Sequence, residues 1–163
     1  MSTNPSVILQ KLQNQKSVFD WQHLLSDIIT TFNCSTGTLH ILDQNTQLLK
    51  LQAEQGIPEF LLPKMKEIPI GKGMAGIAAE RKQPVEMCNL QTDDSGVARP
   101  SAKETKVAGS IAIPMLLNGN LYGVFGIAKP DPYDFTEKEE DVLMKIGEAM
   151  SRYILAQASP EQR

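Results

Sequence analysis

Residues 111–129, IAIPMLLNGNLYGVFGIAK, decide the fold that this sequence predicts. Two apolar runs flank Asn118-Gly119-Asn120. Asn-Gly between apolar runs is a strong hairpin signal, because both residues accept the positive φ that a two-residue turn needs. The stretch therefore predicts an antiparallel hairpin. Pro114 has no amide hydrogen to donate, so we expect it at a bulge or an edge of the sheet.

The two faces of this hairpin differ in size, because side chains alternate between the faces of a strand. The bulky face carries Ile111, Ile113, Phe125 and Ile127, and the small face carries Ser110, Ala112, Gly126 and Ala128. A bulky face suits packed helices. A small face leaves room for a loop or a ligand.

The segments around the hairpin predict a helix after it and a loop before it. Thr136 followed by Glu139 forms a capping box at the start of a helix over residues 136–158. Its apolar stripe runs through Val142, Ile146, Met150 and Tyr153. Residues 91–106, QTDDSGVARPSAKETK, have no apolar period, so we expect a mobile lid there.

The first third of the chain predicts a helix and a second hairpin. Residues 1–32 carry an apolar stripe at helical spacing, from Val7 through Val18 and Trp21 to Phe32. Residues 38–42 and 47–54 then alternate as two strands. On the first of them Leu39 and Ile41 face the helices, which leaves Thr38 and His40 on the small-residue side.

The middle of the chain is less regular. Residues 59–66 predict a short helical or irregular segment broken by Pro63, and residues 74–81, MAGIAAER, predict a helix of small residues before a short strand at 84–87. The order of elements predicts one α+β domain over residues 1–163. It consists of an N-terminal helix (1–32), a central antiparallel sheet with a pocket (34–135) and a C-terminal helix (136–158). Both terminal helices cover one face of the sheet, and the short helix and the lid loop cover the other.

Composition narrows the class of protein. The chain has 163 residues and a net charge of −3, which argues against a nucleic-acid-binding surface, and the lysines between residues 64 and 82 fit a solvated face. It lacks an apolar run of about 20 residues, so we expect no membrane contact. Residues 1–16 lack the pattern of a signal peptide, so we expect a cytoplasmic protein. Cys34 and Cys88 show no metal-ligand spacing, so we expect ordinary half-buried residues and no metal site.

Three phrases together resemble the GAF domain family. They are IPIGKGMAGIAAERKQPVEM (68–87), SIAIPMLLNGNLYGVFGIAK (110–129) and FTEKEEDVLMKIGEAM (135–150), and the resemblance covers about residues 34–154. It implies a small-molecule sensor fold that often dimerises through its terminal helices. It also implies a pocket between the sheet and the lid.

The resemblance extends over the full length to stand-alone GAF proteins that reduce free methionine-R-sulfoxide. Those enzymes need a nucleophilic and a resolving cysteine. Met65, Ala75 and residues 98–102 stand where these cysteines would be, and Ser110, Gly126 and Ala128 replace the substrate-binding acids. The resemblance therefore predicts a pocket without that chemistry.

Two other ligand classes of the family fit poorly. Bilin attachment needs a cysteine at the pocket, and neither cysteine lies in such a motif. The cyclic-nucleotide signature is incomplete, because Ala128 stands where its Asn would be and Glu139 where its Asp would be. What remains of that signature predicts an ion pair between Lys129 and Glu139 that ties the last strand to the last helix.

Ten residues are the candidates for ligand contact. They are Thr38, His40, Met74, Ala75, Asp94, Arg99, Ser110, Ala112, Gly126 and Ala128. Each has a plainer alternative. His40 is a pocket hydrogen-bonding group, a haem ligand or a buried sheet histidine; Met74 could simply pack. Asp94 and Arg99 could serve loop solubility, and the small residues could admit the lid backbone.

These observations predict a non-catalytic sensor or regulatory domain that binds a small molecule and acts in signal transduction through a homodimer. The identity of the ligand or cofactor stays open. Two alternatives remain: an enzyme like the free methionine-R-sulfoxide reductases, and a ligand-free protein-interaction or dimerisation module.

Overall fold

The computed structural model of the chain describes residues 7–10, 20–92 and 106–158. Within these residues, six strands form one antiparallel sheet in the order β3-β2-β1-β6-β5-β4. The elements are α2 (Trp21–Thr31), β1 (Thr36–Asp43), β2 (Leu48–Gln55), η1 (Glu59–Leu61), α3 (Leu62–Met65), β3 (Glu67–Pro69), α4 (Gly73–Arg81), β4 (Val85–Met87), β5 (Ser110–Leu117), β6 (Asn120–Ala128) and α6 (Glu137–Ala158).

Both predicted hairpins are confirmed. In the β5–β6 turn Asn118 and Gly119 have φ of 52° and 80°, the left-handed values that the Asn-Gly pair was expected to adopt. Pro114 lies beyond the part of β5 that β4 covers, and a register shift follows between Met115 and Leu116. The proline therefore sits where β5 becomes an edge, as its missing amide hydrogen requires.

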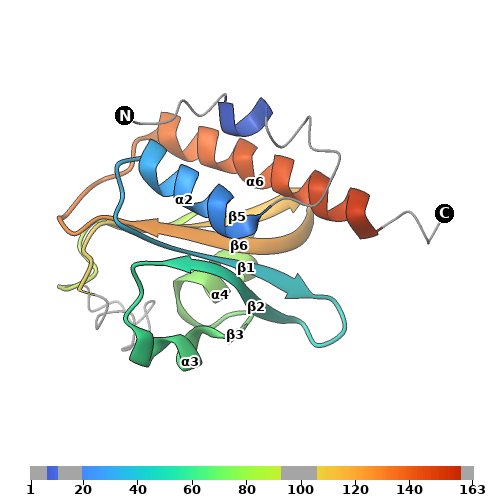
Figure 1. The fold of residues 1–163 in the computed structure, drawn as a ribbon, viewed down its shortest axis with the longest axis horizontal. Helices are drawn as coiled ribbons and strands as arrows, with labels where there is room; N and C mark the ends of the chain where they lie inside the picture. Colours follow the sequence, from blue (N-terminus) through green and yellow to red (C-terminus); the bar gives the residue numbers. More distant parts are fainter. Residues whose placement is uncertain (1–6, 11–19, 93–105, 159–163) are drawn as a thin grey trace.

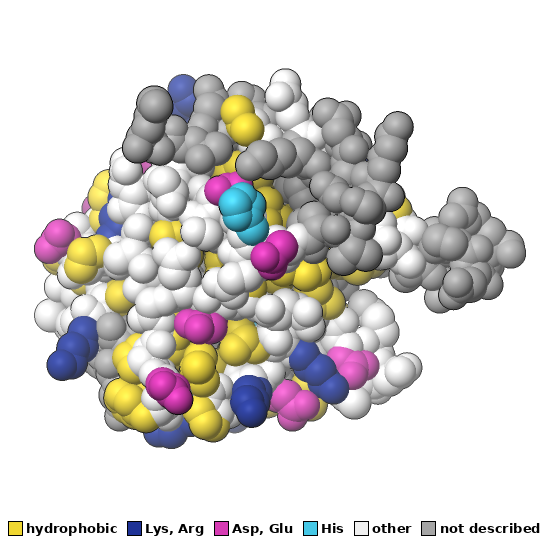
Figure 2. All heavy atoms as spheres, in the orientation of Figure 1, with side chains coloured by type: hydrophobic (Ala, Val, Ile, Leu, Met, Phe, Trp, Pro, Cys, Tyr) yellow, Lys and Arg dark blue, Asp and Glu magenta, His cyan; other side chains and the backbone are white. Residues whose placement is uncertain are grey.

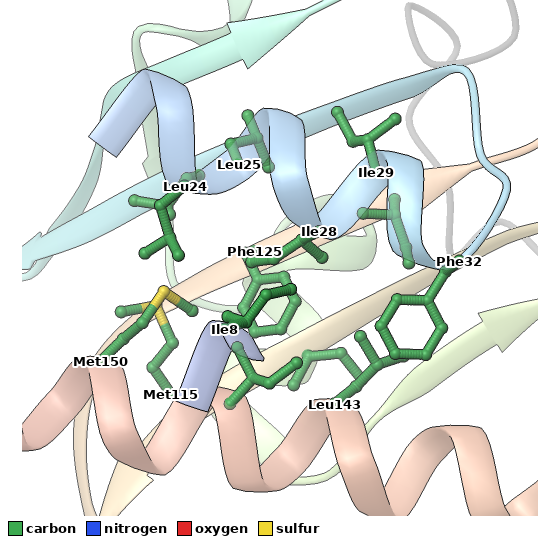
Figure 3. Packing of buried hydrophobic residues seen from close by; sticks show 14 of the residues in the cluster. Ile8, Leu24, Leu25, Ile28, Ile29, Phe32, Met115, Phe125, Leu143 and Met150 are labelled. Carbon is green, nitrogen blue, oxygen red and sulfur yellow. The ribbon is translucent and has the colours of Figure 1, made fainter. Parts of the chain in front are cut away.

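The helices divide between the two faces of the sheet as predicted (Figure 1). α2 and α6 lie together on one face, and α3 and α4 lie on the other. The main core fills the space between the sheet and the pair α2 and α6, where Phe125 is fully buried. Ile8, from the helical residues 7–10, is also fully buried in this core, between the two helices (Figure 3). Burying one such side chain contributes about 1.5–3 kcal/mol.

The N-terminal helix differs from the prediction. Asp20 has an extended backbone, with ψ of 111°, and its carboxylate accepts a hydrogen bond of 2.9 Å from the amide of Gln22. A new helix therefore begins at Trp21, and the expected continuous helix over residues 1–32 is wrong. An aspartate at this position is a strong helix-start signal. Val18 of the expected stripe lies outside the described residues.

Two smaller expectations also need correction. The buried stripe of α6 runs through Leu143, Ile146 and Met150, whereas Val142 is only partly buried. Pro63 does not break its segment but occupies the first turn of α3, where a missing amide hydrogen is tolerated. The capping box at Thr136 is confirmed, and most of the predicted lid, residues 93–105, lies outside the described residues.

The surface has no single dominant charge on the face drawn in Figure 2. Acidic and basic side chains lie interspersed there, and hydrophobic side chains reach the surface around α3. None of the helices within the described ranges is both long enough and apolar enough for a membrane crossing.

Candidate functional site

A cavity of about 150 Å³ lies against the face of the sheet opposite α2 and α6. Its floor comes from β1, β5 and β6, and its walls come from α3, the start of α4 and the neighbouring loops. The cavity lining contains Thr38, His40, Met74, Ala75, Ser110, Ala112, Gly126 and Ala128. The fold thus brings eight of the ten predicted contact residues around one space. Asp94 and Arg99 lie outside the described residues.

Gly126 keeps the floor of this cavity open. A Cβ atom built at Gly126 would meet only sheet atoms, the nearest being the Ile111 carbonyl oxygen at 3.3 Å and the Thr38 hydroxyl oxygen at 3.8 Å. At Gly123, three residues earlier on β6 and therefore on the opposite face of the sheet, a Cβ would clash with the His40 carbonyl oxygen. Gly123 therefore permits close packing of β1 and β6, whereas Gly126 leaves space for something else.

His40 is buried at the cavity, with only 1% of its surface exposed. Its Nε2 lies 2.8 Å from the Met65 carbonyl oxygen, which can only accept, so Nε2 carries the hydrogen. Nδ1 is then an acceptor, and it has no partner among the described residues. Burial lowers the pKa of His40, against the opposing effect of the Met65 hydrogen bond, so the ring is neutral at neutral pH.

The size of the cavity argues against the interpretation of His40 as a haem ligand. A cavity of about 150 Å³ is comparable to one that holds a benzene ring. A haem group is several times larger than this volume. No groups of three or more His, Cys, Asp or Glu residues suited to a metal ion occur within residues 7–10, 20–92 and 106–158.

The charged groups at the cavity are basic. Among the described lining residues there are two lysines, Lys64 and Lys72, and no Asp, Glu or Cys. Both lysines are exposed, and neither forms an ion pair with a described residue. The sequence reasoning missed them, because it assigned the lysines of this region to a solvated face. Gly71 and Gly73 have positive φ and form a tight turn at the start of α4. This glycine turn was the signal in the sequence that Lys72 has a defined position.

The start of α4 faces the cavity without a side-chain cap. Lys72, Gly73, Met74 and Ala75 all line the cavity, and no side chain among the described residues accepts a hydrogen bond from the first amides of this helix. In contrast, Asp20 caps α2 and Thr136 caps α6. Ser110 donates to the Met74 sulfur at 3.5 Å, which joins the end of the floor to the start of α4.

Neither cysteine belongs to the cavity. Cys34 is half-buried against the helical core, and burial raises the pKa of its thiol to about 11, although Lys129 opposes this shift. Cys88 is exposed, not half-buried as expected, and desolvation together with a hydrogen bond to Asp134 raises the pKa of its thiol. Both thiols are therefore protonated at neutral pH, which is unfavourable for nucleophilic attack.

The expected ion pair between Lys129 and Glu139 is wrong. The Lys129 ammonium donates to the carbonyl oxygens of Phe32 and Asn33 at 2.8 and 3.1 Å, and it lies 4.4 Å from the centre of the Tyr133 ring. The Glu139 carboxylate instead accepts hydrogen bonds from the Tyr133 hydroxyl and the Thr136 amide. Lys129 thus ties β6 to the C-terminus of α2, not directly to α6.

The sheet and its two helical layers match those of a known domain family. The family model described as GAF domain matches residues 21–154. The chain therefore belongs to the GAF domain family, as the sequence resemblance predicted.

Solved structures agree with this assignment. The GAF domain of a phosphoenolpyruvate-protein phosphotransferase from Coxiella burnetii is similar with a TM-score of 0.81 and 20% identity, over 98% of this chain and 95% of that one. Free methionine-R-sulfoxide reductase from Neisseria meningitidis, solved with its substrate, has a TM-score of 0.74 and 16% identity, over 93% and 86% of the two chains. At these identities the likeness shows a shared fold.

A third similar structure is a domain of a putative two-component sensor histidine kinase protein from Sinorhizobium meliloti. Its TM-score is 0.67 at 17% identity, over 85% of this chain and 91% of that one. No curated protein sequence matches the chain significantly.

Proposed function

We propose that this chain is a non-catalytic regulatory GAF domain that binds a small molecule in the cavity beneath its sheet. The observation that carries the proposal is the open floor at Gly126, where the nearest atoms to a built Cβ belong to the sheet itself. A domain that only mediates protein contacts has no need for a vacant apolar cavity, since filling it would gain stability. The likeness to a sensor kinase domain supports a role in signal transduction.

The test of this proposal is mass spectrometry of freshly purified protein under native and then denaturing conditions. We expect a small molecule that is bound to the native chain and released on unfolding. Gly126→Ile should abolish the bound mass because its side chain fills the floor, whereas Gly126→Ala should retain it. An empty wild-type protein that also shows no binding in a screen of metabolites would favour the interaction-module alternative.

The likeness to the Neisseria reductase supports one alternative, which is that the chain reduces free methionine-R-sulfoxide. The placement and protonation of Cys34 and Cys88 speak against it, because the described cavity lining offers no thiolate to attack a sulfoxide. We expect no loss of free methionine-R-sulfoxide when the protein is incubated with it and a thiol reductant. Turnover that disappears in Cys88→Ser would overturn this expectation.

We also propose that the domain acts as a homodimer in the cytoplasm, through the layer that contains α2 and α6. Val7 lies next to Ile8, which packs in the core between these helices, and Leu155 lies in α6; their side chains are 39% and 43% exposed and offer apolar contact area on this layer, although Phe60, in η1 on the other side of the sheet, is 68% exposed. The two free cysteines fit a reducing compartment. The native mass in the experiment above measures the oligomeric state, and a monomer at micromolar concentration would contradict the dimer.

A further inference from the structure

The charges around the cavity identify the class of ligand. We infer that the cavity takes a small organic anion with a compact apolar body, whose charged group lies at the start of α4 near Lys64 and Lys72. This inference rests on the proposed function and adds the chemistry of the ligand to it.

Charge complementarity is the first argument. Lys64 and Lys72 flank an apolar cavity whose described lining contains no carboxylate. Among the other described lysines, Lys50 pairs with Asp43 and Glu67 and Lys82 donates to the Gly119 carbonyl oxygen, whereas Lys138 and Lys145 form no ion pair with a described residue. The two lysines at the cavity likewise have no ion-pair partner in the described part of the chain, so an anion bound there displaces no ion pair with a described residue.

The start of α4 is the second argument. The first amides of a helix carry a partial positive charge and lack partners inside the helix. In α4, a helix of nine residues, no side chain in the described part of the chain caps these amides, and Gly73 leaves the backbone accessible beside the cavity. A carboxylate or phosphate placed there would meet amide hydrogens, with the two lysines of the lining at the same cavity.

His40 is a residue of the cavity lining with an unsatisfied polar atom. It is a lining residue that is 99% buried, yet its Nδ1 lacks a hydrogen-bond partner among the described residues. A buried acceptor without a donor costs free energy, and structures rarely leave one unsatisfied.

The cavity also limits the size of the ligand. About 150 Å³ accommodates a body of roughly a benzene ring, and the apolar lining from Ile68, Leu90 and Val107 favours hydrocarbon over a sugar or a nucleotide. The predicted ligand is thus a small ring or branched chain that bears one anionic group.

Four probes of one shape test this inference: benzoate, phenyl phosphate, benzamide and benzamidine. They place a carboxylate, a phosphate, a neutral amide and a cation on the same ring. Binding is measured by titration of the amide resonances of the full chain in NMR at low ionic strength. We expect an anion to bind about tenfold more tightly than benzamide, benzamidine to bind weakest, and added salt to reduce the preference. The tighter of the two anions names the head group.

Matched variants test which residues cause the preference for an anion over the neutral amide. Lys64→Gln with Lys72→Gln should weaken anion binding about tenfold and leave benzamide unchanged. Lys138→Gln with Lys145→Gln removes the same charge from the exposed face of α6 and should change neither. Gly126→Ile should block every probe.

The outcomes separate the two proposals. Equal affinity for benzoate and benzamide, or no effect of the lysine variant at the cavity, overturns the anion inference. The cavity then remains a binding site if Gly126→Ile still blocks benzamide. Absence of binding by all four probes up to millimolar concentrations overturns the inference and also counts against the proposed function.

Discussion

At the scale of a single residue, His40 both lines the cavity and affects the stability of the fold. Strand alternation predicted its side of the sheet correctly, together with the small residues that share that side. The hydrogen bond to Met65 could not be predicted, because it depends on how α3 folds back under β1. For the same reason the positions of Lys64 and Lys72 at the cavity could not be predicted, because they depend on how α3 and α4 approach the sheet.

His40 makes stability depend on pH in a defined direction. Its pKa in the folded chain is below the ordinary value of 6.5, so the unfolded chain binds the proton more readily. The contribution of His40 is therefore complete above pH 6.5 and is lost as pH falls towards the lowered pKa of the folded state. We expect the free energy of unfolding to fall more between about pH 7.5 and about pH 5.5 in the wild type than in His40→Gln.

Urea denaturation at the two pH values measures this difference. His23→Gln is the matched control for replacing a histidine by glutamine at an exposed position, because the side chain of His23 is 68% exposed. Parallel pH dependence in the wild type and His40→Gln would show that burial of His40 does not lower its pKa.

At the scale of elements, the start of a helix was predicted where its capping residues stand in a recognisable pair. The Thr136 hydroxyl accepts from the Glu139 amide at 3.1 Å, and the Glu139 carboxylate accepts from the Thr136 amide at 2.8 Å. Asp20 caps α2 without a partner of this kind, and the apolar stripe that continues on both sides of it concealed the boundary. A helical period alone does not show whether the chain between two apolar turns is itself helical.

The capping box gives a prediction for α6. Thr136→Ala should lower the free energy of unfolding by about 1 kcal/mol, because the amide of Glu139 loses its acceptor. Thr136→Ser keeps the hydroxyl and should retain most of that stability. Urea denaturation measures both variants, and equal stability of the alanine and serine variants would show that the hydroxyl is not the stabilising group.

At the scale of the whole molecule, one sheet separates two environments. On one face the large side chains of β5 and β6 meet α2 and α6 in a filled core, and on the other the small side chains leave a cavity. The alternation of large and small residues in 110–128 therefore predicted both the layer order and the side of the site. The volume of the cavity could not be predicted, since it depends on the separation between α4 and the sheet. The two lysines at its rim, Lys64 and Lys72, could not be predicted for the same reason.

Ile8 has a practical consequence for where this domain can be cut. The family match begins at residue 21, yet Ile8 fills a position between α2 and α6 in the main core. A fragment trimmed to the matched residues would carry a vacant site the size of an isoleucine side chain, which typically costs about 2–5 kcal/mol. A domain of this size has little stability to spare, so such a fragment should express poorly and aggregate. Any excised version used for ligand screening should retain the chain from Val7 onward.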